Sequence, residues 1–124
     1  MVFLLAIAIG GAVGSVLRFL VSKFIQTRVG IEFPVGTLLV NLSSAFLIGF
    51  FFAFFVERLD LSPNLRALLI TGLLGGYSTY STLFYEAYYM LFNGEWLKAL
   101  LYLLISNGLG LLFVAIGYGL GKML

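Results

Sequence analysis

The sequence predicts an all-α membrane protein with four transmembrane helices per chain, the third of them interrupted. Hydrophobic residues make up 62% of the 124 residues and charged residues only 10%, and the mean hydropathy is +1.14. Soluble domains, by contrast, carry about 25% charged residues. The apolar residues gather in four segments, each close to the roughly 20 residues that a helix needs to cross a bilayer. We interpret the chain as one transmembrane domain over residues 1–124, with approximate spans at 2–22, 36–56, 65–91 and 96–120.

The first two spans are defined by the polar links that follow them. No positive residue precedes the apolar stretch at 2–22, so we expect a retained span and not a cleaved signal peptide. The link from Lys23 to Pro34 ends it, and the link from Glu57 to Asn64 ends the second span. Each link is short, which predicts that neighbouring spans run antiparallel.

The other two spans have clear start and turn signals. Ser62 followed by Pro63 is typical of a helix N-cap with proline at the first helical position, which predicts the start of the third helix. Asn93 followed by Gly94 indicates a tight turn in the Phe92–Glu95 link before the fourth helix.

The third span contains a polar run, GLLGGYSTYSTLFYE, from Gly72 to Glu86. Glycine weakens a helix, and Gly75 and Gly76 are followed by four hydroxyl residues: Ser78, Thr79, Ser81 and Thr82. Lipid offers no water to unpaired polar groups, so such a run is costly unless it borders a cavity or a partner chain. We therefore predict a helix interruption at Gly75 to Ser78 and a polar ligand nearby.

The basic residues favour neither membrane orientation. Three of them are expected on the side of the two termini (Arg58, Arg66, Lys122), and three on the other side (Lys23, Arg28, Lys98) or four if Arg18 is included. Loops rich in Lys and Arg normally stay in the cytoplasm. The balance favours dual topology and an antiparallel dimer, although one marginal charge could still fix a single orientation.

Glycine pairs spaced four residues apart could support close helix packing. The pairs are Gly10 with Gly14, Gly72 with Gly76, and Gly117 with Gly121. Residues at this spacing share a helix face, and small side chains there let backbones approach, either within the chain or between two chains.

Several polar residues inside the spans are candidates for a functional site. Arg18 could anchor the first helix at the interface or hold an anion. Glu86 could be a paired structural acid or the end of an ion path, and Asn41 could join helices or donate its amide to an anion. Tyr102 and Ser106 share one face of the fourth helix.

The composition excludes other classes of function. There is no cysteine and no histidine, which removes the usual zinc ligands, and the basic residues form no cluster that would indicate nucleic-acid binding. No nucleophile–base pair or phosphate-binding loop is present, so nothing indicates an enzyme.

Three ordered motifs resemble the small Fluc (CrcB) fluoride-channel family along nearly the whole chain. They are GGAVGSVLR from Gly10 to Arg18, GTLLVNL from Gly36 to Leu42, and the run from Gly72 to Glu86. The resemblance implies an antiparallel dual-topology homodimer in the cytoplasmic (inner) membrane, surrounded by lipid. It also implies two fluoride pathways for passive export and a structural sodium ion between the subunits.

The resemblance also implies roles for single residues. Asn41 matches the asparagine that donates its amide to fluoride, while Tyr80 and Leu83 occupy the positions of two pore-lining phenylalanines. Ser81 and Thr82 match a hydroxyl row that leads to the glutamate, and further matches near the path are Glu86, Tyr102 and Ser106. Gly75 and Ser78 match the pair whose backbone carbonyls hold sodium, and Arg18 belongs to the vestibule or an anchor.

Leu83 departs from the family pattern, because it lacks the positive ring edge that can replace part of a small anion's water shell. A chain with a decayed pore position could be one subunit of a heterodimer made with a paralogous chain, whereas the balanced charges favour the homodimer. A multidrug exporter of the small four-helix kind would need an acid in the first helix, and none is present there. A noncatalytic assembly subunit is a further alternative.

Overall fold

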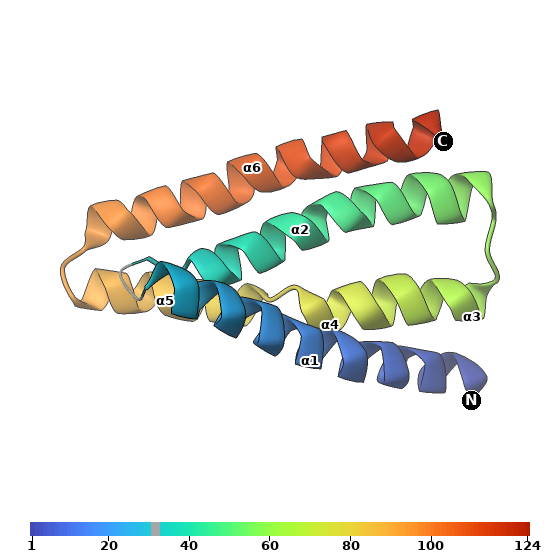
Figure 1. Cartoon of the computed structure of the whole chain (residues 1–124), viewed down its shortest axis with the longest axis horizontal. Coiled ribbons are helices and arrows are strands. Elements are labelled where there is room, and N and C mark those ends of the chain that lie inside the picture. The colour runs from blue at the N-terminus through green and yellow to red at the C-terminus, as the bar shows by residue number, and fades with distance from the viewer. Residues whose placement is uncertain (31–32) are drawn as a thin grey trace.

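The computed structural model describes residues 1–30 and 33–124, which form helices joined by short links (Figure 1). The elements in order are α1 (Val2–Val29), α2 (Val35–Phe51), the π-helical stretch η1 (Phe52–Arg58), α3 (Pro63–Arg66), the π-helical stretch η2 (Ala67–Leu74), α4 (Gly75–Tyr77), α5 (Tyr80–Phe92) and α6 (Trp96–Met123). The two termini and the link between η1 and α3 lie at one end of an elongated bundle, and the turn between α5 and α6 lies at the other.

Within the described residues, three helices are long and apolar enough to cross a membrane: Val2–Val29, Val35–Arg58 and Trp96–Met123. Together with the helical character of the described chain, they confirm an all-α membrane protein. The remaining segment, from α3 to α5, is divided by a break after Tyr77. That this segment is a fourth span stays a prediction.

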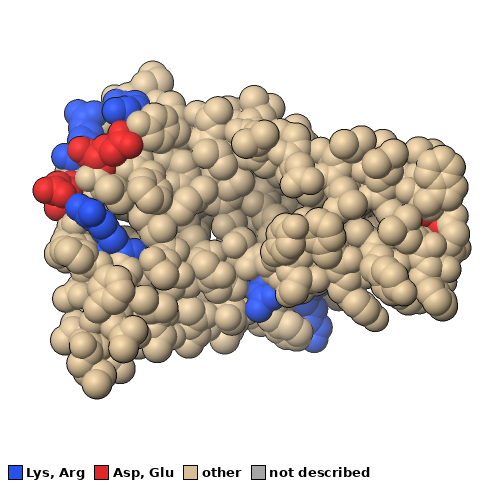
Figure 2. Space-filling view, turned by 180° about the vertical axis from the view of Figure 1, so that it is seen from behind, with Lys and Arg blue, Asp and Glu red and all other residues tan. Residues whose placement is uncertain are grey.

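Charged side chains gather mainly near one end of the molecule. Figure 2 shows a cluster of basic and acidic side chains at that end of the visible face, and further basic side chains near the middle of its lower edge. At the end of the two termini, Arg66 pairs with Asp60 at 2.6 Å, and Lys122 pairs with Glu57 at 3.1 Å. Such a cluster at one end is expected of a protein whose middle lies in lipid.

The first helix is longer than the sequence predicted. The helix α1 extends past the predicted span at 2–22 and continues to Val29, through the first part of the predicted link that begins at Lys23; residues 31–32 of that link lie outside the described residues. The two cations in this last part are exposed, so the extension of the helix buries no charge. The Lys23 ammonium lies 5.6 Å from the centre of the Phe19 ring, and the Arg28 guanidinium 4.7 Å from that of Phe24. Likewise, α6 continues to Met123 and not to residue 120.

Both predicted start and turn signals are confirmed. The Ser62 side chain accepts a hydrogen bond from the Leu65 backbone N–H at 3.3 Å, and Pro63 is the first residue of α3. Gly94 has a positive φ of 80°, and its N–H donates to the Leu91 carbonyl at 3.1 Å, which closes the turn before α6.

The paired glycines allow close helix packing within the chain. An added Cβ at Gly10 or Gly14 would overlap the backbone of η2, and one at Gly76 would lie 2.6 Å from the Gly11 carbonyl oxygen. On the other side of the bundle, a Cβ at Gly117 would overlap the Phe46 carbonyl of α2. These contacts place α1 against η2 and α4, and α2 along α6 (Figure 1). A small hydrophobic core joins α5 to α6 through Leu83, Ala87, Met90, Ala99 and Tyr102.

Candidate functional site

The predicted interruption of the third helical segment is present, but it begins later than predicted. Gly75 and Gly76 are helical and belong to α4, so the break lies at the end of the predicted range from Gly75 to Ser78. Gly76 instead provides room for the Gly11 backbone. The chain leaves the helix at Ser78, with φ −79° and ψ 159°, and Thr79, with φ −147° and ψ 121°.

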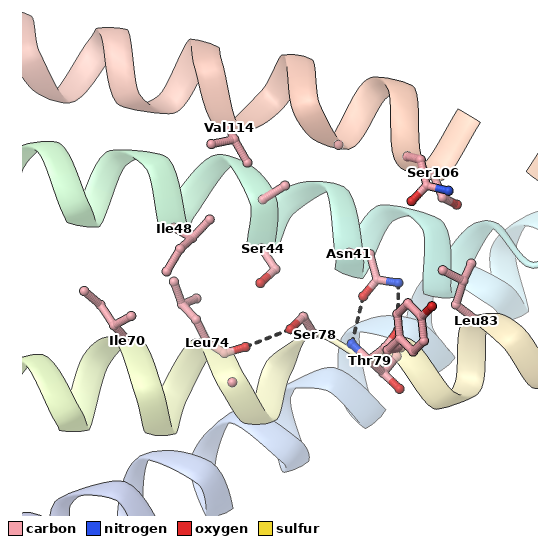
Figure 3. Close-up of a pocket in the computed structure, with 15 residues that line it drawn as sticks. Asn41, Ser44, Ile48, Ile70, Leu74, Ser78, Thr79, Leu83, Ser106 and Val114 are labelled. Atoms are coloured by element: carbon pink, nitrogen blue, oxygen red, sulfur yellow. Dashed lines mark hydrogen bonds between the residues drawn. The ribbon is translucent and has the colours of Figure 1, made fainter. Parts of the chain in front are cut away.

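The side chain of Asn41 replaces the backbone hydrogen bonds that the break removes. Its Oδ1 accepts from the Thr79 N–H at 2.9 Å, and its Nδ2 donates to the Thr79 carbonyl at 3.0 Å (Figure 3). Since a primary amide has two N–H donors, one donor of Asn41 is left for another acceptor. Asn41 therefore both joins α2 to the break and can present an N–H group there.

Two backbone carbonyls at the break lose the donors that a continuous helix would supply. In an α-helix the N–H of residue i donates to the carbonyl of residue i−4. The Thr79 N–H donates to Asn41 and not to Gly75, and the Thr82 N–H donates to the Thr79 hydroxyl and not to Ser78. The carbonyl oxygens of Gly75 and Ser78 are thus suited to a hard cation, which prefers oxygen ligands. No group of three or more acidic, His or Cys side chains that could bind a metal occurs in the described residues.

A groove of about 420 Å³ adjoins the break and is bordered by α2, η2, α4, α5 and α6. Its polar lining includes Asn41, Ser44, Ser78, Thr79, Ser106 and Asn107. Figure 3 shows Asn41, Ser78 and Thr79 close together on one side of it. The Ser106 Oγ is buried and has no hydrogen-bond partner in the described part of the chain, so it can donate to or accept from a guest.

The two residues at the predicted aromatic positions differ in their exposure. Both border the groove, but Tyr80 is 75% exposed and Leu83 only 5%. Leu83 packs in the core between α5 and α6. The ring of Tyr80 lies beside that of Phe84 instead, with 4.5 Å between the ring centres. Tyr80 therefore has an accessible ring at the groove, whereas Leu83 mainly serves packing.

Glu86 is held by two hydroxyl groups and not by Arg18. The Tyr102 hydroxyl donates to Oε1 at 2.8 Å, and the Thr37 hydroxyl donates to Oε2 at 3.2 Å. Tyr102 is fully buried, and its ring meets Phe33 edge-on at 5.3 Å between centres. Three helices therefore converge on one carboxyl group: α2, α5 and α6.

Arg18 lies well inside α1, about 16 Å before its end at a rise of 1.5 Å per residue. It lines a cavity of about 320 Å³ together with Lys23, Thr37, Thr79 and Thr82. The Arg18 Nε is buried without a partner among the described residues. Two cations and several hydroxyls make this cavity suitable for an anion.

The structure brings most of the predicted residues into one connected region, with two exceptions. Ser81 is exposed on α5 and lines none of these cavities, and Leu83 is largely in the core. Two functional candidates were missed: Thr79, which borders both the groove and the Arg18 cavity, and Thr37, which joins that cavity to Glu86. Thr79 was part of the polar run, but nothing in the sequence near Thr37 signals its partner 49 residues away.

Comparisons with known proteins find relatives along nearly the whole chain. The family described as CrcB-like protein, Camphor Resistance (CrcB), matches residues 5–118. A protein of Aquifex aeolicus named fluoride-specific ion channel FluC is 58% identical over 119 residues, covering 96% of each chain. A protein of the same name from Hydrogenobaculum is 49% identical, over 97% of this chain and 98% of the relative. Another from Roseiflexus is 44% identical, over 98% of each chain.

Proposed function

Because the chain belongs to the CrcB family, whose members are ion channels and not enzymes, we propose that it is a fluoride-selective channel of the cytoplasmic (inner) membrane. It would let fluoride leave the cell passively and so lower its toxic concentration inside. The relatives named as fluoride channels support the ion, and the three long apolar helices support the membrane location.

The observation that carries this proposal is the row of polar groups that begins at the helix break. It runs from Asn41 and Thr79 to Thr37 and ends at Glu86, in a chain of which only 10% is charged. Polar groups in lipid are costly unless they line a cavity or a pathway. Thr79 and Thr37 both border the Arg18 cavity, which connects the two halves of the row.

The row can exchange the water shell of a small anion for protein donors. Arg18 and Lys23 attract the ion into the cavity, and the free N–H of Asn41 and the hydroxyls of Thr79, Thr82 and Ser106 donate to it. The ring edge of Tyr80 is positive and replaces further water contacts. At the end of the row, the negative charge of Glu86 disfavours a long stay of the anion and promotes its release.

We propose a structural sodium ion held by the backbone carbonyls of Gly75 and Ser78. Its support is that the helix donors for both carbonyls are used elsewhere, by Asn41 and by the Thr79 hydroxyl. Sodium would supply positive charge that fixes the break. Replacing sodium by N-methylglucamine should lower the thermal stability of the purified protein, and equal stability in both salts would argue against the site.

We further propose an antiparallel homodimer. One chain leaves the groove between α2, α5 and α6 open, and the balanced basic residues allow both orientations. The buried Leu83 gives one reason to consider a heterodimer with a paralogous chain, since it provides no ring edge.

Reconstitution of the purified chain alone tests the proposal. Vesicles are loaded with fluoride or chloride, and valinomycin is added to dissipate the membrane potential. Ion-selective electrodes then measure the anion that leaves the vesicles. We expect fluoride efflux and no chloride efflux. Flux that needs a second chain would favour the heterodimer, and flux of a lipophilic cation dependent on Glu86 would favour an exporter.

A further inference from the structure

One side chain joins the end of α1 to the start of α2 by three hydrogen bonds. The Gln26 Oε1 accepts from the Gly36 N–H at 2.9 Å, and its Nε2 donates to the Phe33 carbonyl at 2.9 Å and to the Gly30 carbonyl. Gln26 is half-buried, and the bonds to Phe33 and Gly36 are partly buried. The residue therefore acts as a cross-link between two helices and not as a surface group.

An amide is the chemical group that this position requires. The first N–H groups of a helix have no partner inside the helix and are normally bonded by a capping side chain. Here Pro34 precedes α2 and makes no side-chain cap, so the acceptor for Gly36 comes from α1. The neighbouring carbonyls need a donor at the same time, and only a group with both an acceptor and a donor satisfies both.

The residue after Gly36 is Thr37, whose hydroxyl donates to Glu86 at 3.2 Å. The start of α2 has little room to shift, because a Cβ on Gly36 would lie 2.6 Å from the Ser22 carbonyl oxygen and 3.2 Å from the Gln26 Oε1. The cross-link thus fixes the position of Thr37 along the bundle relative to Glu86.

Gln26 also separates two cavities of opposite charge. It lines the Arg18 cavity, with Arg18 and Lys23, and a second cavity of about 380 Å³ with Glu86 and Glu95. Ser22 is the other residue common to both. An anion passing from the basic to the acidic side meets Thr37 and Glu86 at this boundary.

From this arrangement we infer that Gln26 is a positioning residue of the anion path: it holds the start of α2 so that Thr37 stays bonded to Glu86. The inference rests on the proposed fluoride channel. It extends that function to a residue that contacts neither Thr37 nor Glu86 through any of its three hydrogen bonds.

The test compares Gln26→Met, which keeps the length of the side chain but removes its hydrogen bonds, with Thr27→Val. Thr27 is the matched control, since it is exposed on the next position of α1. Among the described residues its hydroxyl bonds only to the Phe24 carbonyl of its own helix, at 2.9 Å. We expect Q26M to slow fluoride efflux about tenfold and T27V to leave it within about twofold of the parent.

Two readouts distinguish positioning from a general structural role. In a Thr37→Val background, Q26M should add no further loss of flux, because the contact that it positions is already absent. In addition, infrared spectroscopy identifies the Glu86 carboxyl band as the one that Glu86→Gln removes. Q26M and T37V should shift this band in the same direction, and T27V should leave it in place.

Fluoride efflux from Q26M at the rate of the parent would overturn the inference. So would a double variant in which the losses of efflux from Q26M and T37V multiply while the Glu86 carboxyl band stays in place. Both results would leave the channel proposal intact. If the parent chain releases no fluoride, the channel proposal fails. In that case the infrared comparison alone decides whether Gln26 positions Thr37 against Glu86.

Discussion

The pairing of Asn41 with Thr79 predicts that replacing Asn41 destabilises the helix break itself. Asn41→Leu keeps a side chain of similar size but removes the bonds of 2.9 and 3.0 Å to the Thr79 N–H and carbonyl. Each buried polar group left without a partner costs about 1–3 kcal/mol. Because both bonds are only partly buried, we expect the free energy of unfolding to fall by about 2–4 kcal/mol for the two together.

The matched control is Asn107→Leu. Asn107 is exposed and borders the same groove, but its side chain makes no hydrogen bond within the described residues. The assay is unfolding by sodium dodecyl sulfate in mixed micelles, followed by circular dichroism. We expect N107L to change the free energy of unfolding by less than about 0.5 kcal/mol. Equal losses in the two variants would refute the reasoning that Asn41 holds the break.

Three further predictions concern packing, the carboxyl site and the aromatic position. Gly76→Ala should lower the free energy of unfolding in the same assay by about 1–3 kcal/mol, because the added Cβ would lie 2.6 Å from the Gly11 carbonyl oxygen. The control Gly108→Ala should not lower it, because the space around Gly108 is open. Tyr102→Phe removes the 2.8 Å donor to Glu86 and should slow fluoride efflux about tenfold; unchanged efflux would exclude this donor from the path. Tyr80→Leu should slow efflux to a similar degree and Tyr80→Phe should not, since only a ring supplies the positive edge; equal rates would remove Tyr80 from the path.

Hydropathy and local capping signals were sufficient to predict the helical class, the start of α3 and the turn before α6. They failed at the end of α1, where Lys23 and Arg28 indicated a loop. A cation does not end a helix when its side chain remains exposed beside a ring, as both do here.

The break in the third helical segment illustrates a second limit. The glycines drew the prediction to Gly75 and Gly76, because glycine has a low helix propensity. In the structure the missing side chain of Gly76 serves contact with α1, and the break follows where Asn41 can bond both backbone groups of Thr79. The position of the break therefore depends on a residue 38 positions away as well as on the local cap that the Thr79 hydroxyl provides for the Thr82 N–H.

The candidate site was predictable where its residues interrupt the apolar pattern, as Asn41 and Glu86 do. Thr37 and Gln26 gave no such signal: a threonine within a helix and a glutamine near a helix end are ordinary in any membrane protein. Their importance arises from partners in other helices, Glu86 for Thr37 and Gly36 for Gln26.

The central claim is that this chain conducts fluoride along the polar row ending at Glu86. The most direct measurement is electrode-monitored efflux of fluoride and of chloride from vesicles that contain the purified chain alone, with empty vesicles as the control. The account predicts release of fluoride at rates well above the control and release of chloride indistinguishable from it. Equal release of both anions would contradict selectivity, and release of neither would contradict the channel.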